Sequence, residues 1–133
     1  MARKTSRSSA PRSVRFRPWI REQVERIARR SRRPFSEVVQ DLLDETLRTR
    51  QCPGIYFADE PAGREAKIAG TGLAVWEVIR DYLAEGRDER KLRDALPVLT
   101  PAQVKAALLY YNAWRTEIDQ LIADNANAAS GLA

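Results

Sequence analysis

The sequence has 133 residues, a net charge of +5 and 44% hydrophobic residues, which is enough for one ordinary domain or two small ones. It contains no histidine and one cysteine, Cys52, so an internal disulfide is excluded and a zinc site or a histidine-based catalytic centre is not expected. We therefore predict no enzymatic activity, no cofactor and no metal site. With no long apolar run and no signal-peptide pattern, we expect a cytoplasmic protein without a membrane-spanning segment.

The basic residues are concentrated at the beginning of the chain. Residues 1–33 contain twelve lysines and arginines and two glutamates, a net charge of +10, whereas the remaining residues carry −5. A basic end on an acidic body is typical of a chain that binds a polyanion at one end. A solvated basic tail is the alternative explanation.

Residues 1–12 are rich in Arg, Lys and Ser, and we expect them to form a disordered basic arm. Two roles are open for this arm: contact with the DNA backbone or minor groove, or simple solvation. The basic residues concerned are Arg3, Lys4, Arg7 and Arg12.

The segment Ser13–Arg17 alternates apolar and polar residues, a pattern that predicts a half-buried β-strand. Val14 and Phe16 occupy one face and the two arginines, Arg15 and Arg17, the other. No hairpin partner follows nearby, so we expect the strand to pair with its copy in a second chain. Such a two-stranded ribbon fits the DNA major groove.

Two helices are predicted after the strand. Apolar residues recur at helical spacing from Trp19 to Ala28, the segment Ser31–Pro34 interrupts them, and a second periodic run extends from Phe35 to Leu47. The predicted order is therefore strand, helix, short break and helix.

From Ser13 to Arg48 the chain resembles the ribbon-helix-helix repressors and antitoxins, with a Pro at the first helix start and Ser36-Glu37 opening the second helix. The resemblance implies a dimer formed by residues 13–50. Whether two such dimers pair on DNA is left open. It also implies that Ser13 and Arg15 contact bases, that Arg17 lies beside them, and that the amides of Phe35, Ser36 and Glu37 hold a phosphate. Pro34 stands where the family has a capping residue, so Ser36 is a candidate cap.

Residues 51–72 are predicted to form a linker and a small β-hairpin. A break at Thr49–Gly54 precedes a strand at Ile55–Ala58, turn residues at Asp59–Gly63 and a second strand at Glu65–Ala69. The turn Gly70–Gly72 lacks the longer glycine pattern and the Lys-Ser/Thr end of a phosphate-binding loop.

Three helices are predicted in residues 73–124. The first is closed by Gly86, Asp88 caps the second, and Thr100-Pro101-Ala102-Gln103 is a capping box that opens the third, which we expect to continue to about Asp124. Residues 125–133 are small and polar, and we predict a flexible tail.

The segment Ala69–Leu108, from AGTGLAVWEVIRDYLAEG to DERKLRDALPVLTPAQVKAAL, is similar to the small helical domain of VapB-type antitoxins. That group has Arg-Ile-Pro after the Gly-Thr pair, where this chain has Gly72-Leu73-Ala74. The resemblance implies a mainly α fold: an N-terminal ribbon-helix-helix, a small β-hairpin and a C-terminal, helix-turn-helix-like domain of three helices. Whether this last domain also contacts DNA stays open, although it is not basic.

Several aromatic residues lie in the third predicted helix. Tyr110 and Trp114 lie off the apolar stripe, so they are either part of a wide core or dimer contact, or exposed anchors for a partner protein. The predicted partner-binding residues are Tyr110, Trp114, Arg115, Ile118 and Leu121.

The expected function is that of an antitoxin that dimerises, binds operator DNA, represses its own operon and neutralises a toxin. The resemblance suggests a toxin of the PIN type, a metal-dependent ribonuclease. The alternative is a stand-alone dimeric ribbon-helix-helix regulator with a C-terminal oligomerisation domain.

Overall fold

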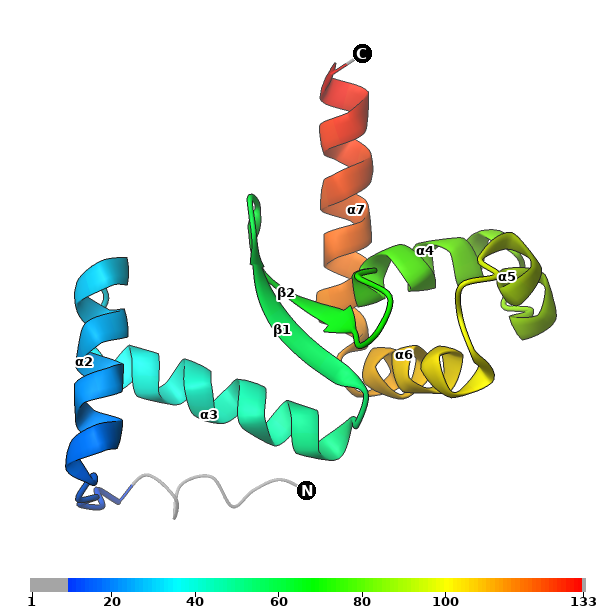
Figure 1. Ribbon diagram of the computed structural model, residues 1–133. Helices are drawn as coiled ribbons and strands as arrows, with labels where there is room; N and C mark the ends of the chain where they lie inside the picture. Colours follow the sequence, from blue (N-terminus) through cyan, green and yellow to red (C-terminus); the bar gives the residue numbers. More distant parts are fainter. Residues whose placement is uncertain (1–9, 133) are drawn as a thin grey trace. The chain divides into compact units, whose positions relative to one another are not determined.

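The computed structural model describes residues 10–132, in which six helices accompany one two-stranded antiparallel sheet (Figure 1). The predicted mainly α class with a small hairpin is confirmed. The elements are α2 (Pro18–Ser31), α3 (Phe35–Gln51), β1 (Ile55–Glu60), β2 (Gly63–Ile68), α4 (Val75–Ala84), α5 (Glu89–Ala95), α6 (Pro101–Ala113) and α7 (Arg115–Leu132). None of these helices combines the length and the apolar character that crossing a membrane requires.

The chain divides into two compact units, one ending at Leu42 and the other beginning at Leu43, within α3. In the first unit, Pro18 opens α2, where its missing N–H costs nothing, and Arg17 before it is extended. Val24 of α2 and Val38 of α3 are the buried apolar residues of this unit. The break predicted between the two helices is confirmed: Arg32 adopts the left-handed conformation, with φ 56° and ψ 43°, and ends α2.

Two boundaries in this region differ from the sequence-based expectation. Residues 11–17 form no strand in the single chain, and the ribbon stays a prediction because it requires a second copy. Helix α3 continues through Gln51, so the break predicted at Thr49 begins only at Cys52, whose N–H still donates to the Arg48 carbonyl. No helix-breaking residue precedes Pro53, which explains why the helix persists.

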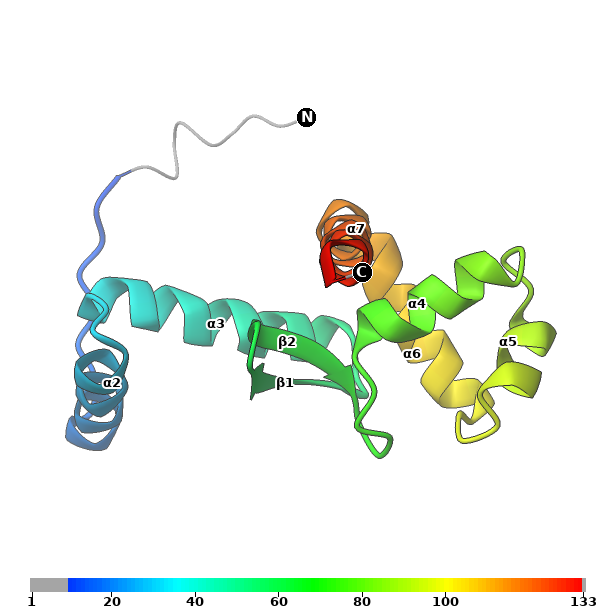
Figure 2. The same ribbon diagram turned by 90° about the horizontal axis from the view of Figure 1, so that it is seen from above.

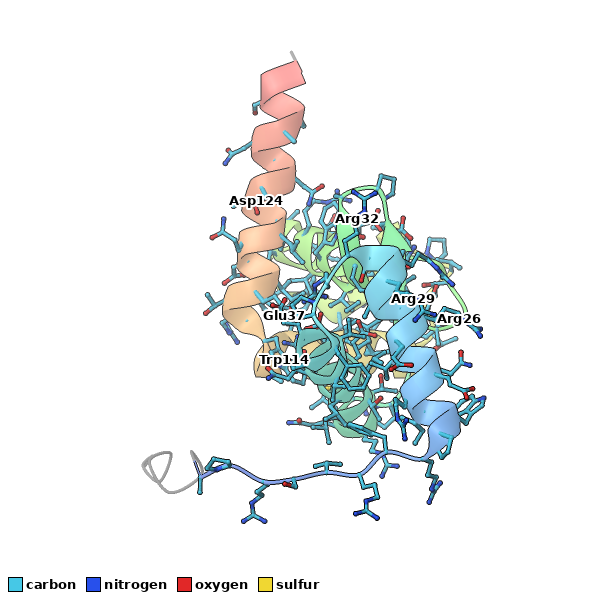
Figure 3. All side chains as sticks on the ribbon, turned by 90° about the vertical axis from the view of Figure 1, so that its left-hand side faces the viewer. Arg26, Arg29, Arg32, Glu37, Trp114 and Asp124 are labelled. Carbon is cyan, nitrogen blue, oxygen red and sulfur yellow. The ribbon has the colours of Figure 1, made fainter. Side chains whose placement is uncertain are left out.

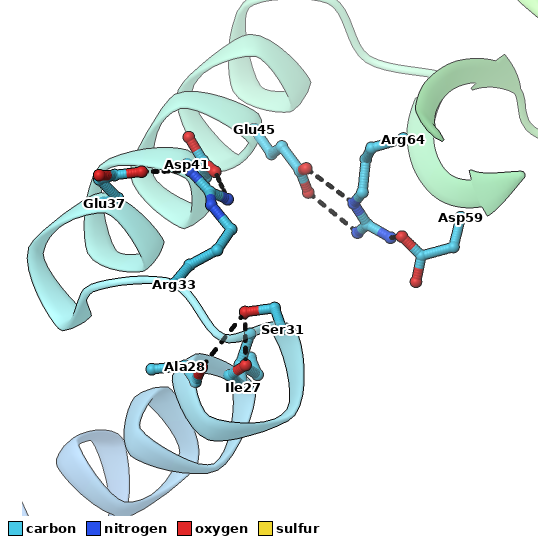
Figure 4. Close-up of polar contacts among 9 residues, drawn as sticks. All are labelled: Ile27, Ala28, Ser31, Arg33, Glu37, Asp41, Glu45, Asp59 and Arg64. Atoms are coloured by element: carbon cyan, nitrogen blue, oxygen red, sulfur yellow. Dashed lines mark hydrogen bonds and ion pairs between the residues drawn. The ribbon is translucent and has the colours of Figure 1, made fainter. Parts of the chain in front are cut away.

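The predicted β-hairpin of the second unit is confirmed, and its strands are longer than expected. β1 and β2 pair antiparallel with Ile55 opposite Ile68 and Glu60 opposite Gly63. Asp59 and Glu60, predicted as turn residues, therefore belong to β1. The hairpin is joined to α3 by Arg64, which donates to both carboxylate oxygens of Glu45 at 2.7 and 3.0 Å (Figure 4).

The core of the second unit is built where the hairpin, α4, α6 and α7 meet. Figure 2 shows α4 lying across α6, with α7 beside them, in agreement with the contacts between these helices. The buried residues of this core are Cys52, Ile55, Ile68, Val75, Val78, Ile79, Leu92, Leu99, Val104, Ala107, Tyr110, Tyr111 and Ile118.

The helix starts in this unit follow the predicted capping chemistry. Asp88 accepts hydrogen bonds from the Arg90 and Lys91 amides at the start of α5. At the start of α6, Thr100 Oγ1 accepts from the Gln103 amide, and Gln103 Oε1 accepts from the Thr100 amide. Gly86, with φ +71°, follows the end of α4, as predicted.

The third predicted helix is wrong in its length, because two helices take its place. Helix α6 ends at Ala113, and Trp114, with φ −127° and ψ 50°, separates it from α7. The sequence has no Pro or Gly at this point; the interruption coincides with packing of the Trp114 ring on Tyr110, with centroids 4.7 Å apart. Helix α7 then extends through Leu132, so residues 125–132, predicted as a tail, are helical.

Candidate nucleic-acid interface

The segment Ser13–Arg17 lies extended before α2, and its polar side chains are exposed. Ser13, Arg15 and Arg17, the predicted base-contacting residues, all belong to this exposed set. Val14 is 69% exposed, which is unusual for an apolar residue in an alternating segment. The alternation is thus present, but its apolar side is only partly covered within one chain.

Phe16 fixes the extended segment against the start of α3. Its ring meets that of Phe35 edge-on, with centroids 5.8 Å apart. A shallow depression beside this contact is lined by residues from the segment, from α2 and from α3. Phe16 is therefore half-buried, whereas its neighbours Arg15 and Arg17 face solvent.

The start of α3 has a geometry that differs from the predicted phosphate site. The amides of Glu37 and Val38 donate to the Pro34 carbonyl at 3.1 and 3.2 Å, so the Glu37 amide already has a partner. Among the hydrogen bonds of residues 10–132, none involves the Phe35 or Ser36 amide or the Ser36 hydroxyl. The predicted three-amide site is therefore reduced to the amides of Phe35 and Ser36, and the proposed Ser36 cap is not formed.

The carboxylate of Glu37 forms an ion pair within the chain. Arg33 donates to Glu37 at 3.1 Å and also to Asp41, one turn further along α3 (Figure 4). This pairing raises the pKa of Arg33, the hydrogen bond to Asp41 being the main cause. It offsets part of the negative charge that Glu37 and Asp41 place near the start of α3.

The remaining predicted DNA-binding residues belong to the N-terminal arm. Arg12 is exposed. Arg3, Lys4 and Arg7 lie outside the described residues.

Large apolar side chains of α2 and α3 are also uncovered. Trp19 is 70% exposed, and Ile27, Leu42, Leu43 and Leu47 are exposed as well. A core shared by two copies would be expected to include Phe16, Val38 and Leu42; of these, Val38 is buried already in the single chain. Uncovered large apolar side chains such as these are typical of residues that another chain covers.

The predicted partner-binding residues do not form one exposed face. Tyr110 and Ile118 are buried, so for Tyr110 the alternative of a wide core holds and that of an exposed anchor does not. Trp114 and Leu121 are half-buried, and Arg115 is exposed. Both side chains pack in the core of the second unit, where the Tyr110 ring also meets Phe57 of the hairpin.

Arg48 was missed by sequence reasoning, although it organises the surroundings of Tyr110. Its guanidinium donates to the Tyr110 hydroxyl at 2.7 Å and to both Glu117 oxygens at 3.0 and 3.1 Å. It also lies 4.5 Å from the centroid of the Trp114 ring. Because these partners are more than sixty residues away in the sequence, no local pattern signals the contact.

The same cluster changes two pKa values. Burial raises the pKa of Tyr110 to about 12, against the opposing effect of its hydrogen bond to Arg48. Burial by itself lowers the pKa of Arg48, but the hydrogen bonds to Tyr110 and Glu117 outweigh this and raise it. The cluster therefore holds a protonated tyrosine and a permanent cation side by side.

The corner between α6 and α7 carries an open depression of about 650 Å³. Trp114 and Arg115 line it, together with Asn112, Thr116 and Gln120. The Arg115 guanidinium lies 4.8 Å from the centroid of the Tyr111 ring and donates to Asn112 at 3.2 Å. Of the predicted partner-binding region, this corner is the part that is exposed.

Residues 58–111 match the family described as Protein of unknown function (DUF433). The match begins in β1, ends in α6 and takes in less than half of the chain. No curated protein and no solved structure matches the chain.

Proposed function

We propose that the chain is a dimeric ribbon-helix-helix DNA-binding protein that acts as the antitoxin of a toxin–antitoxin pair. It represses its own operon and neutralises a toxin, with a PIN-type ribonuclease as the expected partner. The single observation that carries the DNA-binding part is the extended, exposed segment Ser13–Arg17, placed directly before the helix pair α2–α3.

Dimerisation follows from what one copy leaves uncovered. Val14 on the extended segment and Leu42 on α3 remain exposed, while Val24 and Val38 are the buried apolar residues of this unit. A unit of this size buries too little apolar surface to be stable alone. A second copy that pairs its segment with this one would cover Val14 and complete the backbone hydrogen bonds of both.

Recognition of DNA is then divided between two kinds of contact. Arg15, on the outward side of the ribbon, is suited to a bidentate hydrogen bond with a guanine edge in the major groove. The amides of Phe35 and Ser36, at the positive end of the α3 dipole, are suited to a phosphate. Arg33 supports this second contact because it offsets part of the charge of Glu37 nearby.

The toxin contact is proposed for the corner between α6 and α7. Trp114 and Arg115 line the depression there, and Leu121 is half-buried on α7. An aromatic ring beside an arginine is the residue combination that dominates many protein interfaces. Arg115 could pair with acidic metal ligands of a ribonuclease, because guanidinium and carboxylate form strong bidentate hydrogen bonds.

The DNA-binding part is tested with the purified full chain and the DNA upstream of its own gene. Sedimentation of the wild type should give a dimer, and fluorescence anisotropy should give specific binding. Arg15→Ala should lose about 1–3 kcal/mol of binding free energy on this DNA and little on scrambled DNA. Arg93→Ala, an exposed arginine on α5, is the matched control. Unchanged affinity of the dimeric Arg15→Ala protein would refute the proposal.

A capture experiment distinguishes the proposed antitoxin from the alternative function, a stand-alone regulator. The product of the adjacent gene should co-purify with the wild type and be lost from Arg115→Glu, while DNA binding stays intact. Lys105→Glu, an exposed charge reversal on α6, is the control. DNA binding without capture of that product by the wild type would favour the regulator, whose C-terminal unit would then serve oligomerisation.

A further inference from the structure

The C-terminal end of α2 carries a dense group of arginines that the ribbon does not include. We call Arg26, Arg29, Arg30 and Arg32 the α2 corner. Figure 3 labels Arg26 and Arg29 along α2, and Arg32 at the end of the helix. Residues 26–34 contain five arginines and no acidic residue.

The arginines of the α2 corner are exposed and have no carboxylate partner within the described part of the chain. The ion pairs among residues 10–132 include Arg33 but none of these four. Glu22 and Glu25, one turn earlier on α2, also form none. Four cations thus lie close together without an ion-pair partner among residues 10–132, and a bound anion would reduce their mutual repulsion.

Helix stabilisation explains only part of this group. Cations in the last turn interact favourably with the helix dipole, which accounts for Arg29 and Arg30. Arg26 lies one turn earlier, where that effect has faded. Arg32 has a positive φ, at a position where glycine is the least strained residue. Helix stability alone would therefore favour glycine at position 32.

The α2 corner lies next to the start of α3 in the sequence and in the same compact unit. Only Arg33 and Pro34 separate Arg32 from Phe35, whose amide belongs to the proposed phosphate site. Along α2, Arg26, Arg29 and Arg30 have the i, i+3, i+4 spacing that places side chains on one face. A duplex held by the α3 amides would thus meet the same compact unit that carries these guanidinium groups.

We infer that the α2 corner binds the phosphates of duplex DNA outside the bases that the ribbon contacts, independently of sequence. This inference rests on the proposed DNA-binding function and extends its contact surface. Duplex DNA is favoured over an anionic membrane because the α2 corner is followed after two residues by Phe35, where the proposed phosphate site begins.

The left-handed backbone conformation of Arg32 allows a specific test of this inference. Arg32→Gly removes the charge and relieves the left-handed backbone, so the melting temperature should stay equal or rise. Each substitution removes two arginines from a dimer. Counterion release contributes a salt slope of about 0.9 for each phosphate contact, so the slope of log K against log salt should fall by up to about 1.8. At 0.1 M salt this corresponds to a loss of roughly 60-fold.

Arg87→Gly is the matched control, since Arg87 is the other non-glycine residue with a positive φ among residues 10–132. A second pair compares Arg29→Gln with Arg93→Gln, because both arginines lie in the last turn of a helix. Affinity is measured by anisotropy at four salt concentrations, on a duplex with the upstream sequence and on a scrambled duplex of equal length.

The inference predicts equal losses on both duplexes for Arg32→Gly and Arg29→Gln, and no change in slope for the two controls. An unchanged slope for the folded, dimeric Arg32→Gly protein, with wild-type binding intact, would overturn the inference and leave the proposed function standing. A wild type that binds neither duplex would overturn both. Binding to vesicles with 30% phosphatidylserine that depends on Arg32, without any effect on DNA, would assign the α2 corner to a membrane and also overturn the inference.

Discussion

Replacement of Arg48 by methionine should destabilise the second unit, because this arginine joins α3 to the corner between α6 and α7. Its side chain is only 15% exposed, and it contacts Tyr110, Trp114 and Glu117. Methionine keeps the apolar stem of the arginine, so the substitution removes mainly the guanidinium.

The expected magnitude can be built from the individual contacts. The charged hydrogen bond to the buried Tyr110 hydroxyl contributes about 1.5–3 kcal/mol, and the stacking on Trp114 adds about 0.5–1 kcal/mol. The pairs with Glu117 and Asp44 add little, because those carboxylates are 44% and 57% exposed. The methionine variant does not bury a cation, and the desolvation cost that it avoids offsets part of the decrease in the free energy of unfolding. We expect a decrease of about 2–3 kcal/mol in the free energy of unfolding.

The assay is urea unfolding followed by circular dichroism and tryptophan fluorescence, at pH 7. Arg50→Met, an exposed arginine on the same helix, is the control and should change the free energy by less than about 0.5 kcal/mol. If Arg48→Met were as stable as Arg50→Met, the cluster would not stabilise the second unit as we describe.

Three further outcomes are expected. Because the pKa of Tyr110 is about 12 in the folded chain and 10.0 ordinarily, only the unfolded state loses this proton between those pH values. The free energy of unfolding should therefore fall by about 2 kcal/mol from pH 10 to pH 12, and the difference between wild type and Tyr110→Phe in urea titrations isolates this part. Thr100→Ala should cost about 1 kcal/mol in the same assay, because the capping box of α6 is lost, and an unchanged midpoint would contradict that role. Val14→Asp should give monomers in sedimentation experiments, whereas a dimer of wild-type affinity would place the interface elsewhere.

Local chemistry in the sequence was sufficient for much of the fold. Pro18 before an apolar period, Asp88 as a cap, and the Thr100–Gln103 capping box each specify a helix start through neighbouring residues alone. The hairpin was likewise predicted from turn residues between two short alternating runs. These elements agree with the structure because their determinants lie within a few residues of one another.

The parts that the sequence did not predict depend on contacts between distant residues. The break at Trp114 has no Pro or Gly beside it, and it coincides with packing on Tyr110 and Arg48. The burial of Tyr110 depends on the same contacts, with Phe57 on the hairpin also against its ring. Helical periodicity places a residue on a face of one helix, but it does not say where that helix stops. The ribbon is a different case, because its partner strand lies in another chain.

The central claim is that a dimer contacts DNA through Arg15, and selection from a random duplex library tests it most directly. Full-length wild type and Arg15→Ala are used in parallel, with Arg93→Ala as the control. A symmetric dimer should enrich inverted repeats, because its two copies present the same residues to two half-sites. We predict a guanine at one fixed position in each half-site for the wild type and the control, and loss of that preference for Arg15→Ala. A folded, dimeric wild type that enriches no sequence, or the same half-site selected by Arg15→Ala, would contradict the account.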